Sequence, residues 1–533
     1  RSNEEELRRI QSTVENQARC APAAQAVVST ADVLSAVNKL KLRKSDGDRG
    51  FMSNHLIFGG RSYFEEIASL VTAMFIHGAI PEELLKASIV SIPKSYNKSL
   101  GDSTNYRGIA LCCSLSKVVD LIILDRNRSA LWTSDLQFAF KEGMSTSMCT
   151  LLLKEVVNYY RSMKSNVYSC FLDATKAFDR VRFDRLFDEL IKREVSMPDI
   201  RLLLHLYSNQ KVRTTWRSSA SSFFNVSNGI RQGSIASPVL FCVYLNALLE
   251  SLKDAGVGCW VGRNYCGAMV YADDITLLSP SLSGLKAMLK TCERFCGSAD
   301  VQFNAMKSMA VCFGAMSAEK LRLQLPSLNF CGGKVEWSDH VKHLGNYISY
   351  DLSEKKEIEM KRGDLVGRVN FVLARYGGFP IQILRRIFNS QCCHLYGAQT
   401  WLLSDPAVKR FHTMHNRCLR RILQLPAMTH TRYLPLINKM PSSISQVSRR
   451  SHKIEESMSS IDNVTIGSIT RILLSMSNSI LSKNKHYRNN IESEPPSDED
   501  RAVVTAILEL MSDRILNFDE SECTEFAQFL CIE

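Results

Sequence analysis

The chain has 533 residues and is 45% apolar, which is enough for two to four globular domains or subdomains with large cores. Its 17 cysteines include no Cys-x-x-Cys pair, and no apolar run reaches about 18 residues, so a disulfide framework and a membrane span are both excluded. The net charge of +12 divides unevenly, because residues 491–533 carry 12 acids against 2 bases. The preceding 490 residues are therefore strongly basic and suited to polyanionic partners.

The N-terminal segment is predicted to be helical over residues 4–44 and ends in a basic cluster at residues 39–44. We interpret this cluster as a solvated helix end, and a nuclear-import signal is the alternative. Residues 45–50 contain two glycines and two aspartates and break the pattern. No signal peptide opens the chain, and because residue 1 is Arg rather than Met we expect a piece of a longer product.

Residues 64–315 alternate between helical and β-prone patterns. Helical stretches flank β-prone residues 87–93 and the segment 105–111, and residues 138–315 fit a mostly antiparallel sheet backed by helices. Ser237-Pro238 predicts an N-cap and a first helical residue, and the polar loop before it, residues 229–234, would lie at a helix N-terminus. Such a place favours nucleotide phosphates or bases.

Two carboxylate centres lie within this region. Tyr271-Ala272-Asp273-Asp274 stands between two short apolar runs and predicts a hairpin that holds both acids at its tip. Asp173 follows the apolar run 167–172, so an acid at a strand end can face the hairpin acids across a sheet. Adjacent carboxylates repel one another, and a site that keeps them together usually needs a cation. Magnesium is expected, because it prefers hard oxygen ligands shared with phosphates.

The C-terminal third changes character twice. Residues 355–425 hold 13 Lys or Arg against 4 acids on helix-forming sequence with interleaved aromatics, which fits either a phosphate-gripping surface or a solvated basic face. After Pro441 the chain becomes rich in Ser and Asn, and residues 493–500 predict a disordered linker. Residues 501–516 predict a short amphipathic helix within the acidic tail.

The order of motifs resembles reverse transcriptases, and among them those of non-LTR (LINE-like) retrotransposons, over about residues 35–430. The matching segments are Asn105 to Leu111 in the fingers, Gln137-Phe138-Ala139-Phe140 with Gly143 and Ser145-Thr146, Asp173 in motif A, Gln232-Gly233 with Ser237-Pro238 in motif B, Tyr271 to Asp274 in motif C, Asn304 with Lys307 in motif D, and His343-Leu344-Gly345 in the primer grip. Residues 396–401, Tyr-Gly-Ala-Gln-Thr-Trp, resemble a thumb signature of non-LTR elements.

The resemblance implies an α+β right-hand polymerase with fingers, a palm whose antiparallel sheet is backed by helices, a helical thumb and a C-terminal extension. The predicted boundaries are an N-terminal helical extension at 1–49, fingers at 50–165, palm at 166–350, thumb at 351–430, a helical connector at 431–490 and an acidic tail at 491–533.

The resemblance also implies roles for individual residues. The predicted catalytic and metal-binding acids are Asp173, Asp273 and Asp274, the last as an auxiliary ligand or electrostatic support, and the proton donor to pyrophosphate is Lys307. The predicted substrate-binding residues are Arg107, Phe178, Gln232, Gly233 and Tyr271. Phe178 occupies the position of the steric gate that excludes a 2′-hydroxyl, and Lys94 or Lys117 are further candidates for the triphosphate. Asp179 is predicted to be a structural partner rather than a metal ligand.

The function implied is an RNA-directed DNA polymerase that extends a DNA 3′ end on an RNA template, with Mg²⁺, dNTPs and primer or target DNA as partners. The alternatives are an inactive element fragment that only binds RNA and an RNA-dependent RNA polymerase, which Phe178 disfavours. Residues 45–51 and Gly108 lack the prolines usual in the family, and an endonuclease is expected in a missing part of the chain. We expect an intracellular protein, in the nucleus with a cytoplasmic ribonucleoprotein phase.

Overall fold

The computed structural model describes residues 2–45, 50–95, 99–217, 219–314, 325–489, 497 and 501–505. Residues 46–49, in the segment predicted to break the N-terminal helical pattern, lie outside these residues, and so does nearly all of the predicted acidic tail, apart from residue 497 and the short helical stretch 501–505. Among the described residues, no single helix is long and apolar enough to cross a membrane. The segments Glu4–Cys20 and Ala23–Asn38 reach that length and composition only as a pair, bent by 114°.

The central sheet has six strands in the order β12-β13-β11-β3-β10-β9. Their bounds are β3 Val167–Leu172, β9 Ala268–Tyr271, β10 Asp274–Ser279, β11 Met309–Phe313, β12 Leu328–Phe330 and β13 Gly333–Trp337. All pairings are antiparallel except that of β11 with β13. The predicted mostly antiparallel sheet is therefore confirmed.

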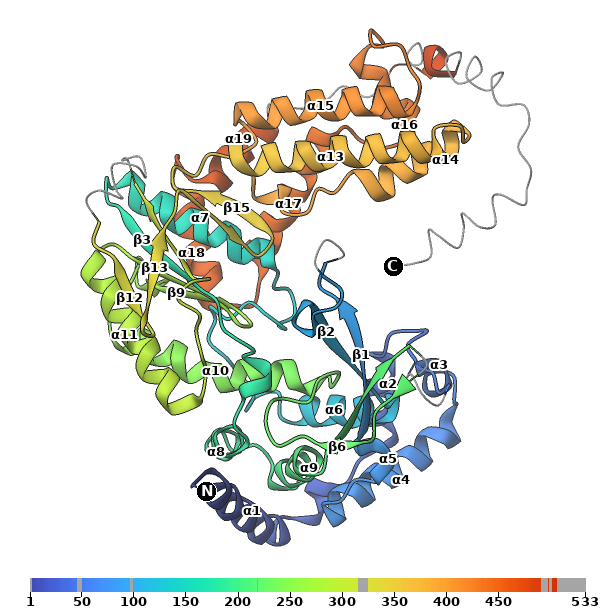
Figure 1. Ribbon diagram of the computed structural model, residues 1–533, viewed down its shortest axis with the longest axis vertical. Coiled ribbons are helices and arrows are strands. Elements are labelled where there is room, and N and C mark those ends of the chain that lie inside the picture. The colour runs from blue at the N-terminus through green and yellow to red at the C-terminus, as the bar shows by residue number, and fades with distance from the viewer. Residues whose placement is uncertain are drawn as a thin grey trace.

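Helices cover both faces of this sheet. Figure 1 shows α10 (Ala236–Asp254) and α11 (Leu282–Ala299) below it and α7 (Thr146–Ser162) above it. The hairpin of β14 (His340–His343) and β15 (Asn346–Ser349) lies on the α7 side, where His343 contacts Phe171 and Cys149. Because side chains alternate along a strand, the face that carries Phe171 is also the face on which Asp173 emerges.

A second sheet lies beside the first, built on β1 (Lys86–Pro93), β2 (Tyr106–Cys112) and β4 (Lys211–Trp216), with the short strands β5 (Ser219–Ala220) and β6 (Phe224–Asn225) at its edge. β1 pairs antiparallel with β2 and parallel with β4. Strand pairing therefore crosses the predicted boundary between fingers and palm, because β4 follows Asp173 in the chain. Likewise α7, inside the predicted fingers range, packs on β3 and β9.

The predicted thumb is helical and has an apolar core of its own, with Trp401 and Phe388 fully buried in it. It contains α13 (Lys355–Tyr376), α14 (Ile381–Ile387) and α15 (Pro406–Ile422), and Figure 1 shows α13 and α15 side by side. The following helices are α16 (Leu434–Asn438), α17 (Ser443–Ser460), α18 (Val464–Leu474) and α19 (Ile480–Asn489).

Two helix predictions need correction. The N-terminal segment is not one helix: α1 (Ser2–Cys20) ends before Pro22, and α2 (Thr30–Asn38) begins anew behind a capping box in which Ser29 and Asp32 bond each other's backbone. The helix predicted to begin at Pro238 begins at Ala236. Ser234 Oγ accepts from the amides of Ala236 and Ser237, so the side chain that caps the helix is Ser234.

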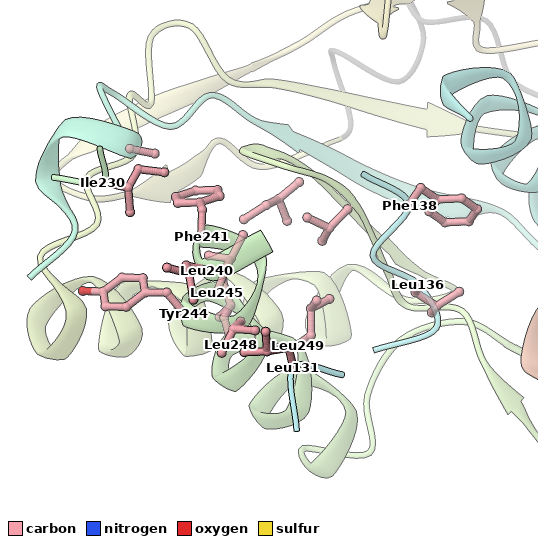
Figure 2. Packing of buried hydrophobic residues seen from close by; sticks show 14 of the residues in the cluster. Leu131, Leu136, Phe138, Ile230, Leu240, Phe241, Tyr244, Leu245, Leu248 and Leu249 are labelled. Atoms are coloured by element: carbon pink, nitrogen blue, oxygen red, sulfur yellow. The ribbon is translucent and has the colours of Figure 1, made fainter. Parts of the chain in front are cut away.

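The core below the sheet centres on α10, which is apolar around most of its circumference and correspondingly buried. Figure 2 shows Leu240, Phe241, Tyr244, Leu245, Leu248 and Leu249 on this helix packed with Leu131 and Ile230. Leu136 and Phe138 extend the cluster along a segment beside the sheet. That segment also touches the turn between β9 and β10.

Candidate active site

The register of the central sheet brings the predicted acids together. Leu172 at the end of β3 pairs with Ile275 of β10. Asp173 follows Leu172 and Asp274 precedes Ile275, so these two carboxylates leave neighbouring strands at the same sheet edge. Asp273 stands beside them, in the two-residue turn that joins Tyr271 to its partner Asp274.

This turn is strained. Ala272 has a φ of +57°, which favours the turn geometry of a two-residue hairpin but costs a residue with a Cβ about 1–2 kcal/mol. Ala272 is 6% exposed, so its amide cannot be satisfied by bulk water. The amide donates instead to Oε1 of Gln137, 3.1 Å away. The turn that carries Asp273 is thus fixed by a side chain from a distant segment.

The electrostatics of the acids follow from their crowding. Burial raises the pKa of Asp273, repulsion from Asp173 raises it further, and Arg107 opposes both effects. Burial together with repulsion from Asp273 and Asp173 raises the pKa of Asp274 to about 6. As they stand, no three His, Cys, Asp or Glu side chains among the described residues form a ready metal site. The donor set nevertheless suits a hard cation, because three carboxylates that repel one another share one edge.

Residues 303–308 wrap around the end of β3. Asn304 donates its amide to the carbonyl of Asp173, and the amide of Asp173 donates to Ser308 Oγ at 3.1 Å. This places Lys307, whose side chain is 67% exposed, with Nζ 3.9 Å from Asp173 Oδ2. A cavity of about 280 Å³ adjoins the pair and extends under the turn at Leu344 and Gly345.

Phe178 packs against the turn that carries Asp273. Its ring stacks on Phe241 of α10 at 4.2 Å between centroids and packs in a small cluster with Tyr271 and Ala272. Its carbonyl accepts from the amide of Ile230, which ties it to the loop that precedes α10. Phe178, the predicted gate, therefore contacts the turn that carries the acids, and Phe241 supports its ring.

The loop predicted to touch the nucleotide joins the two sheets. Gln232 donates from Nε2 to Asp179 Oδ1 at 2.9 Å, a contact of the kind expected if Asp179 is a structural partner. Gly233 has a φ of +81°, and a Cβ there would lie 2.3 Å from the carbonyl of Ala110 in β2. Residue 233 must therefore be glycine because its backbone lies against the fingers strand β2.

Arg107 and Tyr271 belong to different sheets, Arg107 to β2 and Tyr271 to β9. Arg107 is exposed on β2, and its positive charge lowers the pKa of Asp273. Among the hydrogen bonds and ion pairs of the described residues, none joins Arg107 directly to Asp273. Burial raises the pKa of Tyr271, and Tyr396 nearby raises it further. Lys94, the other triphosphate candidate on this strand pair, donates to the carbonyl of Thr104.

The thumb signature docks on the palm beside the acids. The hydroxyl of Tyr396 donates to the carbonyl of Leu344 at 3.0 Å and shares a hydrogen bond with Thr146 Oγ1 at 2.9 Å. Gln399 bonds Ser147. Gln137, Thr146 and Tyr396 belong to motifs of the sequence, but the sequence alone predicted no role for these three residues. The only sequence signal for a role of these residues was that each belongs to a motif.

A sheet with acids from adjacent strands at one edge, a second sheet reaching toward them and a separate helical subdomain above define a right-hand nucleic-acid polymerase. Residues 92–348 match the family described as reverse transcriptase (RNA-dependent DNA polymerase). They form a reverse transcriptase domain, and the relatives described next, which come from retrotransposable elements, make it one of the LINE-like, non-LTR kind.

Individual relatives support the same family. Over 231 residues the chain is 28% identical to a Pol polyprotein of the type-1 retrotransposable element R2 from Nasonia vitripennis, covering 43% of this chain and 22% of that protein. It is 24% identical over 410 residues to the element R1 polyprotein of Bradysia coprophila, covering 74% and 39%. It is 23% identical over 452 residues to the RNA-directed DNA polymerase from mobile element jockey of Drosophila funebris, covering 80% and 47%. The chain spans less than half the length of each of these relatives.

Proposed function

We propose that this chain is the RNA-directed DNA polymerase of a non-LTR retrotransposon, which extends a DNA 3′ end on an RNA template. The observation that carries the proposal is the meeting of Asp173 with Asp273 and Asp274 at one sheet edge, where each raises the charge repulsion on the others. Such an edge suits a divalent cation shared with the phosphates of an incoming nucleotide.

The acids Asp173, Asp273 and Asp274 would hold magnesium, with Asp274 as an auxiliary ligand. When bound, magnesium lowers the pKa of the primer 3′-hydroxyl and neutralises charge on the departing pyrophosphate. Lys307, whose Nζ lies 3.9 Å from Asp173 Oδ2, would donate a proton to pyrophosphate. Its high exposure leaves it free to swing toward the leaving group.

The remaining predicted residues would bind the nucleotide. Arg107, an exposed guanidinium whose field reaches Asp273, presents a fork of donors to the triphosphate. Phe178 beneath the turn would block a 2′-hydroxyl and so select dNTPs. Gln232 would contact the base pair, with Asp179 restraining its amide and Gly233 and Tyr271 shaping the walls.

The nucleic-acid partners would be template RNA and a primer or target DNA, gripped in part by the basic thumb. Arg410 and Arg417 are exposed and lie seven residues apart, on one face of α15. We propose that the endonuclease that would cut a target lies in another part of a longer product. We also propose that the protein acts in the nucleus, with a cytoplasmic ribonucleoprotein phase.

Primer extension on an RNA template with magnesium and dNTPs tests the proposal. Asp273→Asn should lower the rate by about 100-fold or more, since a lost metal ligand removes several kcal/mol of transition-state stabilisation. Binding of the primer–template should stay within about threefold, because binding rests on phosphate contacts elsewhere. Asp188→Asn, which alters a surface acid paired with Lys192, is the matched control.

Three outcomes would contradict the assignment. Unchanged activity in Asp273→Asn would remove the acids from catalysis. Salt-sensitive RNA binding by the wild type without incorporation under any divalent cation would favour an inactive RNA-binding fragment. Preferential incorporation of rNTPs would favour an RNA polymerase.

A further inference from the structure

One buried polar side chain at the site has no part in the chemistry above. Gln137 is 0% exposed, and its Oε1 accepts two amide protons, from Ala139 and Ala272, both at 3.1 Å. Its Nε2 is buried without a hydrogen-bond partner. The opposite amide orientation would aim an NH₂ group at two N–H donors, so the oxygen must face the turn.

The segment that carries Gln137 is fixed against the edge strand β9. The amide of Phe138 donates to the carbonyl of Val270 at 2.8 Å, and the amide of Val270 donates to the carbonyl of Leu136 at 2.9 Å. Leu136 and Phe138 are buried in the core, where Figure 2 shows them beyond the residues of α10. Backbone pairing and packing therefore leave Gln137 little freedom to move away from the turn.

The loop before this segment is fixed as well. Ser134 donates its amide to Asn246 Oδ1 of α10 at 2.6 Å, and its carbonyl accepts from the amide of Gln137. Lys141 donates from Nζ to the carbonyls of Thr133 and Ser134. The acceptor oxygen of Gln137 is thus part of a rigid frame rather than of a mobile loop.

The hydrogen bond from Ala272 to Gln137 supports the strained residue of the turn. Ala272 holds a positive φ one residue before Asp273 and two before Asp274. If its amide lost its acceptor, a buried donor would be unsatisfied in a strained turn, and the turn could relax by rotating the peptide. Such a rotation would move both acids relative to Asp173, whose own backbone is held separately by Ser308 and Asn304.

We propose that Gln137 is a positioning residue, which holds the turn at Ala272 and so sets the geometry of Asp273 and Asp274 toward Asp173. This inference rests on the proposed polymerase function. Gln137 touches no reacting atom.

The decisive variant is Gln137→Met, which keeps the length of the side chain and removes the acceptor. We expect kcat to fall between about 10- and 100-fold, as for small displacements of catalytic groups, while KM for primer–template stays within about threefold. The magnesium concentration for half-maximal activity should rise severalfold. Amide hydrogen exchange across residues 268–276 should accelerate, and Mn²⁺ binding followed by electron paramagnetic resonance should weaken.

Two further variants separate positioning from packing. Phe138→Leu perturbs the same segment without touching the turn and should leave kcat and the magnesium dependence near wild type. Gln137→Glu keeps an acceptor oxygen at the same length and should lie closer to wild type than Gln137→Met. If Gln137→Met does not fold, Gln137→Asn, whose amide is one methylene too short, should show the same losses.

Wild-type values in Gln137→Met or Gln137→Asn would overturn the proposal, and so would an equal loss in Phe138→Leu. A wild-type chain that incorporates no nucleotide would instead defeat the proposed function. In that case hydrogen exchange and Mn²⁺ binding would still decide whether Gln137 holds the turn.

Discussion

At the scale of residues, the three acids of the site repel one another, and in our proposal a bound cation relieves that repulsion. Asp173, Asp273 and Asp274 leave adjacent strands, and the pKa of Asp274 rises to about 6. Each carboxylate thus costs free energy while it is ionised and uncompensated. In the proposed function these charges hold the cation, so the fold gives up some stability for function at this edge.

The raised pKa of Asp274 determines how the stability of the fold depends on pH. Because the folded pKa of Asp274 lies above its ordinary value, the folded protein holds more protons than the unfolded chain between about pH 4 and 6, and stability falls as pH rises through this window. In EDTA at pH 8, Asp274→Asn should be more stable than wild type by about 1 kcal/mol, since partial exposure screens the repulsion. Urea unfolding at pH 5 and pH 8 measures this. A difference that does not shrink toward pH 5 would contradict the expectation.

Phe178 is the residue on which sugar selection depends in our proposal. Phe178→Val should raise the kcat/KM for an rNTP relative to its dNTP by about 10- to 100-fold, the range that one hydroxyl-sized contact controls. Single-nucleotide incorporation with paired dNTP and rNTP measures the ratio. Phe183→Val, which opens the core at Tyr207 instead, should lower stability without changing the ratio.

At the scale of elements, a buried ion pair fastens the thumb to the palm. Lys154 of α7 donates to both carboxylate oxygens of Glu354, at 2.8 and 3.0 Å, and the two side chains are 3% and 2% exposed. Lys154 also donates to the carbonyl of Thr400, and Glu354 accepts from the amide of Leu402. Glu354 immediately precedes α13, so the pair sets where the thumb begins.

Breaking one side of this pair leaves an uncompensated buried charge. Lys154→Met should therefore lower the free energy of unfolding by about 3–5 kcal/mol, whereas Lys154→Met with Glu354→Gln should recover much of the loss. Denaturant unfolding of the double-mutant cycle measures the coupling. Arg61→Met, which breaks the exposed pair with Glu65, should cost less than about 1 kcal/mol. Additive losses in the cycle would count against the fastening role.

At the scale of the whole molecule, the helices after the thumb return to the palm. Glu155, next to Lys154 on α7, accepts from Ser479 Oγ at 2.9 Å and from the amide of Leu481 at 2.8 Å. Asn484 donates to the carbonyl of Trp401 in the thumb. Apolar residues of α17 to α19, among them Met458, Ile466, Ile469 and Leu481, belong to the main core. The predicted connector is thus built into the polymerase body.

Truncation tests this integration. A chain ending after Met440 loses the partners of Glu155 and uncovers the apolar surface beneath α17 to α19, so we expect aggregation or rapid proteolysis. A chain ending after Thr505 keeps every described residue, including Val504 in the thumb core, and should fold and extend primers. Limited proteolysis and size-exclusion chromatography compare the two. A stable, active chain ending after Met440 would show that the connector is dispensable.

Local pattern was sufficient for much of this protein. Apolar runs on either side of Asp273-Asp274 predicted the hairpin, and the run before Asp173 predicted the strand it leaves. Helix boundaries were less secure, because Ser234 caps α10 three residues before the more conspicuous Ser237. Pro22 was a signal for the break after α1 that the helical pattern of its neighbours outweighed.

By itself, then, the sequence determined the acids, the basic thumb and the order of the motifs, because composition and short-range periodicity record which residues must be buried or charged. Only the tertiary structure decided how distant segments meet: Gln137 bonds Ala272 across 135 residues, Lys154 reaches Glu354 across 200, and Glu155 reaches Ser479 across 324. Each of these contacts joins a single buried polar group to another, and a single group leaves no periodic trace in the chain. Its partner is fixed by sheet register and packing, which exist only once the whole core has formed.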